Sequence, residues 1–277
     1  MRQDERGHFD QALRGARMTA HDPDEFVGQE GLMRAGEILE LARRAGIGPG
    51  VSVLDLCCGV AGPGRFLTAE LGNSYLGVDY SASAIDLARE RAGDLPCRFE
   101  VSHVPPVPPG PFDVVLLLET MLAFADKEGL VREVSAALRP GGRFAFTVEE
   151  GRPLTDAERE AMPDADTVWP VALPDLLACL ERVGLEVTWI QECSRHHQAV
   201  VESLLAAFVA DGRSIAERVG HLALEELLVA HRLWSGWLKD GRVRKFAVVT
   251  RRSSGHARRS ARHASMNRVG VPPRPCT

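Results

Sequence analysis

The chain lacks the long apolar stretch of a membrane protein. None of its hydrophobic runs approaches the ~20 residues that a helix needs to span a bilayer, so we expect no membrane segment and no membrane partner. The first ten residues, MRQDERGHFD, are polar and charged, unlike a secretory signal peptide. These two absences lead us to expect a cytoplasmic location.

Cysteine is sparse, with six residues scattered over 277 positions. No CxxC pair offers the ligand spacing of a zinc site, so we expect no metal ion. Cys57 and Cys58 are adjacent and lie in a glycine-rich loop. We interpret them as small packing residues rather than as redox partners.

A basic face is missing as well. The formal net charge is −5, whereas nucleic-acid-binding proteins usually present clustered Lys and Arg, so we expect no nucleic-acid partner. The basic residues that do cluster lie at the end of the sequence, in a stretch rich in Ser, Gly and Pro that has little to bury. We expect residues 253–277 to form a disordered tail.

What the chain does have is a strand, a tight loop and a helix in residues 53–67, VLDLCCGVAGPGRFL. An apolar run carries Asp55 at its end, and a glycine-rich loop follows. Glycine there lets the backbone approach a ligand and turn back into a helix, and Pro63 suits the first helical turn. This order is typical of the opening unit of an α/β nucleotide-binding sheet.

The next strand, SYLGVDY at 74–80, also ends in an acid. Asp79 at its tip can accept both hydroxyl groups of a ribose. The glycines of the first loop follow G-x-x-G-x-G rather than the G-x-G-x-x-G of dinucleotide-binding proteins. An acid before the loop suits a cofactor with a sulfonium and an ammonium group better than one with a pyrophosphate.

Helices and strands continue to alternate along the chain. We expect helices at 29–45, 63–72, 82–92, 126–138 and 174–183, and strands at 97–101, 112–118, 143–149, 185–191 and 245–251. This pattern predicts an α/β fold with a doubly wound, seven-stranded, mostly parallel sheet. By region, we expect an N-terminal lid and helix (1–45), a core (46–194 and 240–252) and a helical cap insertion (195–239).

With these elements the chain resembles the class I S-adenosylmethionine-dependent methyltransferases, which have a Rossmann-like fold. The likeness covers roughly residues 30–250 and rests on the 53–67 loop, FDVVLLLE (112–119), LRPGGRFAFTVEE (138–150) and KFAVVTR (245–251). FVGQEGL (26–32) is also similar to the sarcosine/dimethylglycine and tocopherol-like branches. The resemblance implies transfer of a methyl group from S-adenosyl-L-methionine to an N, O or C atom of a small-molecule acceptor. We expect a monomer or a homodimer.

By this resemblance, the cofactor would bind outside the carboxyl ends of the strands. The residues expected to contact it are Asp55, Cys57, Cys58, Gly59, Asp79, Tyr80, Ser102, His103 and Leu118. Asp55 and the backbone of 57–59 would hold the methionine end, Asp79 the ribose, and Tyr80 would lie against the adenosine. The family commonly has glycine where Cys57 and Ala61 stand, so this loop is bulkier.

Methyl transfer is an in-line displacement that depends on alignment and on exclusion of water. A general base is required only when the acceptor arrives protonated, and histidine suits that task near neutral pH. The candidate catalytic residues are His196 and His197, at the start of the expected cap, and Glu119, near the transferable methyl group. A purely structural role is the alternative for each.

Two other functions remain open. A nicotinamide-dependent oxidoreductase would share the sheet, although the acid before the glycine loop and the final antiparallel strand are unlike that class. A non-catalytic S-adenosylmethionine-binding protein would keep the fold, with Cys57 and Ala61 filling the methionine pocket. After the fourth strand the sequence reads LETM (118–121), without the N/D-PP-Y/F of nitrogen methyltransferases or the Pro-Cys of cytosine-C5 enzymes, which again speaks against nucleic acid.

Overall fold

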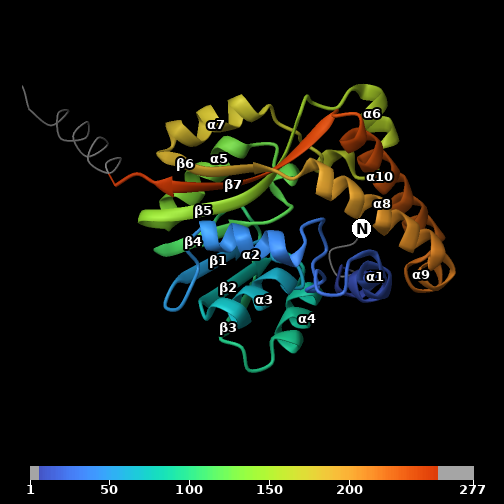
Figure 1. Cartoon of the computed structure of the whole chain (residues 1–277), viewed down its shortest axis with the longest axis horizontal. Coiled ribbons are helices and arrows are strands. Elements are labelled where there is room, and N and C mark those ends of the chain that lie inside the picture. The colour runs from blue at the N-terminus through green and yellow to red at the C-terminus, as the bar shows by residue number, and fades with distance from the viewer. Residues whose placement is uncertain (1–5, 255–277) are drawn as a thin grey trace, which may run out of the picture.

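Seven strands form one sheet in the computed structural model, which describes residues 6–254 (Figure 1). The strands are β1 (Ser52–Leu56), β2 (Ser74–Asp79), β3 (Cys97–Val101), β4 (Phe112–Leu117), β5 (Leu138–Gly151), β6 (Leu185–Glu192) and β7 (Val243–Arg252). Their order is β3-β2-β1-β4-β5-β7-β6. Only β7 runs antiparallel to its neighbours, so the predicted seven-stranded, mostly parallel α/β fold is confirmed.

Ten α-helices lie within the described residues. They are α1 (Arg6–Ala20), α2 (Ala35–Arg44), α3 (Gly62–Leu71), α4 (Ala82–Ala92), α5 (Lys127–Ala137), α6 (Asp156–Ala161), α7 (Leu173–Arg182), α8 (Ser194–Ala210), α9 (Gly212–Val219) and α10 (His221–Lys239). Two short 3-10 helices, Met121–Ala123 and Ala165–Thr167, interrupt the loops after β4 and α6. Helices therefore follow the strands as the alternating sequence pattern predicts.

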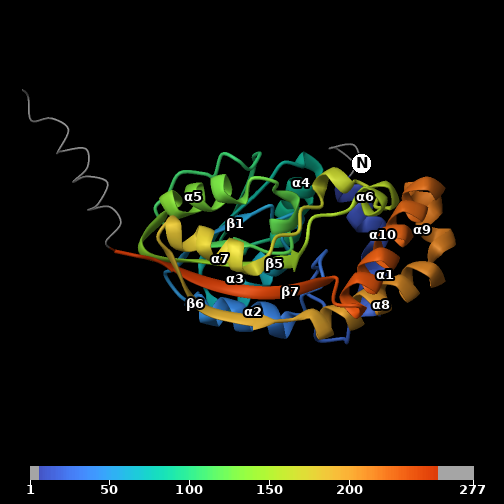
Figure 2. The same cartoon turned by 90° about the horizontal axis from the view of Figure 1, so that it is seen from above.

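Helices cover both faces of the sheet, which explains why its central strands are apolar throughout. Successive residues of a strand point to opposite faces: Val53 of β1 belongs to the core under α2, α3 and α4, and Leu54 to the core under α5 and α7. Figure 2 shows the sheet nearly edge-on, with α2 on one side and α5 and α7 on the other. Burial on both faces is typical of doubly wound parallel sheets.

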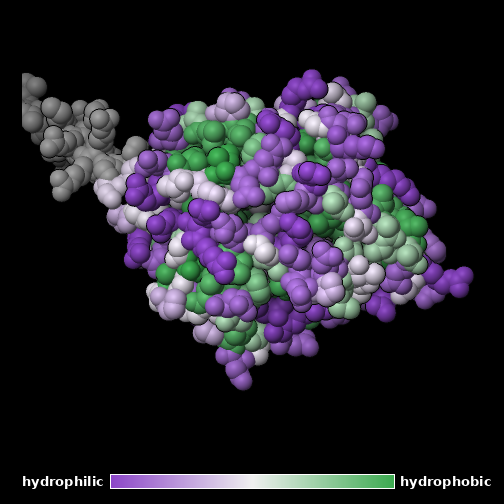
Figure 3. All heavy atoms as spheres, in the orientation of Figure 1, coloured by the Kyte–Doolittle hydropathy of each residue, from purple (hydrophilic) through white to green (hydrophobic). Residues whose placement is uncertain are grey.

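Helices α8, α9 and α10 lie between β6 and β7 in sequence and pack together with α1 at one end of the sheet (Figure 1). Leu13 of α1, Leu204 and Phe208 of α8 and Ile215 of α9 share a buried cluster. Met18, Val209 and Leu222 of these helices are among the large apolar side chains left exposed, and Figure 3 shows apolar atoms over this end. Because α8 follows β6, whose carboxyl end lies at the ligand-binding edge, the group stands beside that edge.

The N-terminal region differs from the expected long helix at 29–45. Helix α2 begins only at Ala35, and residues 25–34 run as an irregular segment, here called the strap. Gly28 in this segment has a φ of +88°, a conformation that glycine adopts without the strain other residues suffer. Residues 6–20, expected only as part of a mobile or lid-like segment, form the regular helix α1.

The proposed tail at 253–277 lies almost wholly outside the described residues. None of the helices between residues 6 and 254 combines the length and hydropathy that crossing a bilayer requires.

Candidate functional site

The loop between β1 and α3 is tightly coiled at the carboxyl edge of the sheet. Cys57, Gly59 and Ala61 all have positive φ angles, of 57°, 53° and 55°, although only one of them is glycine. The Cys58 amide donates to the Val78 carbonyl oxygen at 3.0 Å, and the Ala61 amide to the Cys58 carbonyl oxygen at 2.8 Å. The loop is therefore held against the tip of β2.

Asp79 fastens this loop to the second strand. One of its carboxylate oxygens accepts the Gly59 amide at 3.0 Å and the other accepts the Ser81 amide at 2.9 Å. Ser81, not Asp79, caps α4 by accepting the Ala84 amide. The Asp79 carboxylate is 1% exposed, so in this structure it faces the loop, and its expected contact with a ribose stays a prediction.

Asp55 is buried near the end of β1 and lines a cavity. The Tyr75 hydroxyl donates to its carboxylate at 2.6 Å. Burial is the largest cause that raises the pKa of Asp55 to about 7; the Tyr75 hydrogen bond opposes it and the Asp79 charge adds to it. A cation bound beside Asp55 would favour its ionised form.

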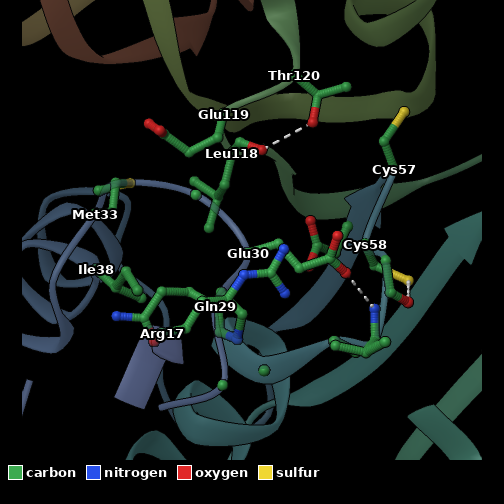
Figure 4. Close-up of a pocket in the computed structure, with 18 residues that line it drawn as sticks. Arg17, Gln29, Glu30, Met33, Ile38, Cys57, Cys58, Leu118, Glu119 and Thr120 are labelled. Carbon is green, nitrogen blue, oxygen red and sulfur yellow. Dashed lines mark hydrogen bonds between the residues drawn. The ribbon is translucent and has the colours of Figure 1, made fainter. Parts of the chain in front are cut away.

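The cavity beside Asp55 has a volume of about 230 Å³ and lies between the glycine loop and the N-terminal segment. Figure 4 shows Arg17 of α1 reaching into it, with Gln29 and Glu30 of the strap at its side and Leu118 above. Arg17 is buried and paired with Asp10 at 2.8 Å. One cavity thus offers both a guanidinium and carboxylates.

The strap lines one side of this cavity. Glu30 accepts the Val60 amide at 3.3 Å, and the Leu32 amide donates to Glu119 at 3.0 Å. Gly62 lies so close to the strap that a Cβ there would be 2.2 Å from the Gly28 carbonyl oxygen. The strap is therefore held to the carboxyl edge of the sheet at Glu30 and Leu32 by hydrogen bonds, and at Gly28 by close packing.

A second, larger cavity of about 750 Å³ adjoins the first and shares Cys57, Glu119 and Thr120 with it. Its walls include Tyr80 and Val104. The Tyr80 ring stacks on His103 with centroids 5.9 Å apart. These walls present aromatic and apolar surface together with the carboxylates of Asp126 and Asp164, and no arginine or lysine among the described residues lines them.

Ser102 lies beside this region without lining either cavity. Its amide donates to the Asp79 carbonyl oxygen at 2.9 Å, and its hydroxyl to the His103 carbonyl oxygen at 3.3 Å. The structure therefore brings the nine expected cofactor-contacting residues to one edge of the sheet, with Asp79, Ser102 and His103 behind the cavity walls.

Glu119 is locked in a buried ion-pair network. Lys245 of β7 lies 2.6 Å from Glu119 and 2.9 Å from Glu149. Burial acts to raise the pKa of Glu119, but the charges of Lys245 and His197 and the hydrogen bonds from Lys245 and Leu32 prevail and hold it well below its usual range. Figure 4 shows its carboxylate turned away from Glu30 and Cys58. So strong an acid is a poor general base, and the geometry does not favour that candidate role.

The two candidate histidines lie elsewhere. His197 is 0% exposed, with Nε2 at 3.4 Å from Glu37 of α2. His196 lies 3.2 Å from the Arg34 guanidinium and lines a separate cavity between α2 and β6. Neither lines the two cavities at the glycine loop, because the first turn of α8 faces α2. The structure does not bring these histidines to the expected site of methyl transfer.

Sequence reasoning missed Arg17, Glu30 and Lys245. Lys245 had a signal, since a lysine at the head of an apolar strand (KFAVVT) is rarely buried unless it is paired. Arg17 and Glu30 had none, because they reach the site through the packing of α1 and the strap.

Comparisons with known proteins find methyltransferases. A family model described as a methyltransferase domain matches residues 54–146. The chain is 27% identical over 191 residues to methyltransferase GfsG of Streptomyces halstedii, covering 64% of this chain and 68% of that protein. It is 34% identical over 126 residues to phosphoethanolamine N-methyltransferase 1 of Arabidopsis thaliana, covering 44% of this chain and only 25% of that one.

Among solved structures, the fold is similar to phosphoethanolamine N-methyltransferase 2 of Haemonchus contortus in complex with S-adenosyl-L-methionine. The TM-score is 0.71 at 18% identity, over 88% of this chain and 57% of that chain. Residues 54–146 thus match a methyltransferase domain, and the sheet order is that of the Rossmann-like methyltransferase fold, so the chain is similar to the class I S-adenosylmethionine-dependent methyltransferases.

Proposed function

We propose that this enzyme transfers the methyl group to an N, O or C atom of a small-molecule acceptor, with S-adenosyl-L-methionine lying across the two adjoining cavities. The observation that carries the proposal is their contrast. One cavity holds Arg17, Glu30 and Asp55, and the other combines Tyr80 and apolar residues such as Val104 and Phe124 with the acids Asp126 and Asp164. The zwitterionic amino-acid end of the cofactor suits the charged groups of the first cavity, and its flat adenine end suits the aromatic and apolar surface of the second.

In this placement the first cavity holds the amino-acid end. Arg17 pairs with the carboxylate and Asp55 with the ammonium group, while the backbone of 57–59 passes beneath. Asp79 binds the ribose, Tyr80 lies along the adenosine, and Ser102 and His103 border the adenine. Leu118 and Thr120, where the cavities meet, flank the sulfonium.

The cofactor supplies an electrophilic methyl group on its sulfonium. The protein's residues align the two reactants and keep out water. The strap contributes to the second task, since its bonds to Val60 and Glu119 hold it along one side of the first cavity. Ionised Glu119 holds the strap in place through the Leu32 amide and is a positioning residue in this scheme.

The predicted regions of the chain stay part of the proposal. They are a core of residues 46–194 and 240–252, covered by residues 1–45 and by the cap of residues 195–239. A cytoplasmic location, a monomer or homodimer, and the absence of nucleic-acid partners also stay predictions. Cys58, Cys97, Cys179 and Cys193 are free thiols, which supports a reducing compartment.

The proposal is tested by titrating S-adenosylhomocysteine into the wild type and an Asp79→Ala variant by isothermal calorimetry. We expect micromolar binding by the wild type and loss of at least about 100-fold in the variant, because the ribose contact and the anchor of the Gly59 amide disappear together. Asp86→Asn, on the exposed face of α4, is the matched control. Unchanged affinity in Asp79→Ala, or tighter binding of NADH than of S-adenosylhomocysteine, would contradict the proposal.

A second measurement tests Arg17. Replacing it with methionine should weaken S-adenosylhomocysteine binding about tenfold or more, because a charge-assisted hydrogen bond contributes about 1.5–3 kcal/mol. Arg91→Met is the control, since Arg91 also pairs with Asp10, at 2.9 Å, but does not line the cavity. Equal loss in both variants would show that Arg17 acts only by holding Asp10.

A further inference from the structure

Outside the methyl-transfer site, three side chains of metal-binding type meet between α2 and the start of α8. Glu37, Cys193 and His197 each offer one ligand atom, and these atoms all lie within 4.8 Å of one another. Cys193 and His197 are buried and Glu37 is largely so. The cluster does not line either cavity at the glycine loop.

Several polar atoms of this cluster have no hydrogen-bond partner. The Nδ1 of His197 is buried without a hydrogen-bond partner, while the His197 Nε2 and the Glu37 Oε1 have only long contacts of 3.4 Å, to Glu37 and to His196. Buried polar groups are almost always hydrogen-bonded or bound to an ion, because leaving them unpaired is costly. The cluster therefore points to a partner of its own.

The backbone presets the three ligands. Cys193 precedes the first residue of α8 and His197 follows it by four positions, with the His197 amide donating to the Cys193 carbonyl oxygen at 3.0 Å. Side chains four residues apart lie on one face of a helix. Glu37, in the first turn of α2, is fixed by the Arg34 amide at 3.0 Å. A cavity of about 220 Å³ lined by Glu37 and Cys193 gives access to a water molecule.

We propose that Glu37, Cys193 and His197 bind a zinc ion, with water as the fourth ligand. Thiolate, imidazole and carboxylate are the ligands that Zn²⁺ takes in tetrahedral sites, at about 2.0–2.3 Å. Binding displaces the thiol proton of Cys193 to solvent and forms a Zn–S bond, with no change of oxidation state. This departs from the expectation of no metal, which considered only CxxC spacing.

The local charge balance allows the ion. The Cys193 thiolate and Glu37 offset its two positive charges, and the nearby group of Lys245, Glu119 and Glu149 carries one net negative charge. The Arg34 guanidinium, 3.5 Å from Glu37, is also in contact with His196 and can shift toward it. The ion would join α2, and through it the strap, to the cap.

One other arrangement explains the same cluster. A protonated His197 would form a buried ion pair with Glu37 across the 3.4 Å that separates Nε2 from the carboxylate. That ion pair requires no metal and leaves Cys193 as a thiol. A metal titration therefore distinguishes it from the proposed zinc site.

The test titrates cobalt(II) into the full-length protein after removal of metal by a chelator. We expect one ion per chain, near-ultraviolet sulfur-to-cobalt charge-transfer absorption, and its loss when zinc displaces the cobalt. Cys193→Ser should abolish the absorption and weaken metal binding about tenfold or more, and Glu37→Gln should weaken it without removing the sulfur band. Cys179→Ser is the matched control, because Cys179 is also buried but lies in α7.

Zinc should also raise the melting temperature of the wild type and not that of Cys193→Ser. S-adenosylhomocysteine binding by each variant verifies that it is folded, and this readout keeps the result separate from the proposed methyl-transfer site. A wild type that takes up no stoichiometric metal, or a charge-transfer band that persists in Cys193→Ser, overturns the zinc site and leaves the His197–Glu37 ion pair.

Discussion

Replacing Lys245 with methionine should destabilise the protein by about 3–5 kcal/mol, because two buried carboxylates would lose the ammonium group that pairs with both of them. Glu119 and Glu149 lie 2.6 and 2.9 Å from it, and the side chains of Lys245 and Glu149 are 5% and 4% exposed. Burial acts to lower the pKa of Lys245, but the two glutamates raise it overall. A loss of this size is a large part of a typical folding free energy of about 5–15 kcal/mol.

Urea unfolding followed by circular dichroism measures this loss. Lys239→Met, at the exposed end of α10, removes the same charge and should change the unfolding free energy by less than about 0.5 kcal/mol. Adding Glu119→Gln and Glu149→Gln to Lys245→Met should restore part of the stability, since no unpaired charge then remains. Equal stability of Lys245→Met and wild type would refute the account of this network.

The second large effect concerns Asp55→Asn, which should stabilise the free protein at pH 8 while weakening cofactor binding. Burial, partly offset by the Tyr75 hydrogen bond, raises the pKa of Asp55 from 3.8 to about 7, a difference of about 3 pH units that corresponds to about 4 kcal/mol. Between about pH 4 and 7 the unfolded chain releases this proton and the folded chain keeps it, so the folded state loses stability as pH rises. Asparagine removes that dependence and can still accept the Tyr75 hydroxyl.

Urea unfolding of both proteins from pH 4 to 8 tests this sign. The stability of Asp55→Asn relative to wild type should rise across the interval by up to about 4 kcal/mol and be level above it. The same variant should bind S-adenosylhomocysteine about 10–100-fold more weakly, through loss of the ammonium contact. A relative stability that is flat with pH, or that falls, would contradict the raised pKa.

The sheet could be predicted from the sequence because its signals are local. The apolar runs that end at Asp55 and Asp79 place β1 and β2, and the glycines and Pro63 between them place the loop and α3. Each of these signals depends on neighbours within a few residues. The expected cofactor contacts follow the strands directly in sequence, so their position at the carboxyl edge of the sheet could be predicted in the same way.

The covering of the site could not be predicted, since it depends on contacts between distant segments. Glu119 was expected as a catalytic candidate near the methyl group, but its role in the strap depends on Leu32, 87 residues away. His196 and His197 lie in the first turn of α8, and the direction in which that turn faces is set by packing on α2. No sequence pattern near His196 and His197 predicts which way their side chains face.

The close approach of Gly62 to Gly28 has a kinetic consequence. In the proposed placement of the cofactor in the first cavity, the strap, bonded at Val60 and Glu119, would have to release these contacts to let it exchange freely. The rate at which the product S-adenosylhomocysteine dissociates would then equal the rate at which the strap, residues 25–34, opens. Turnover would be limited by this opening rather than by the methyl-transfer step.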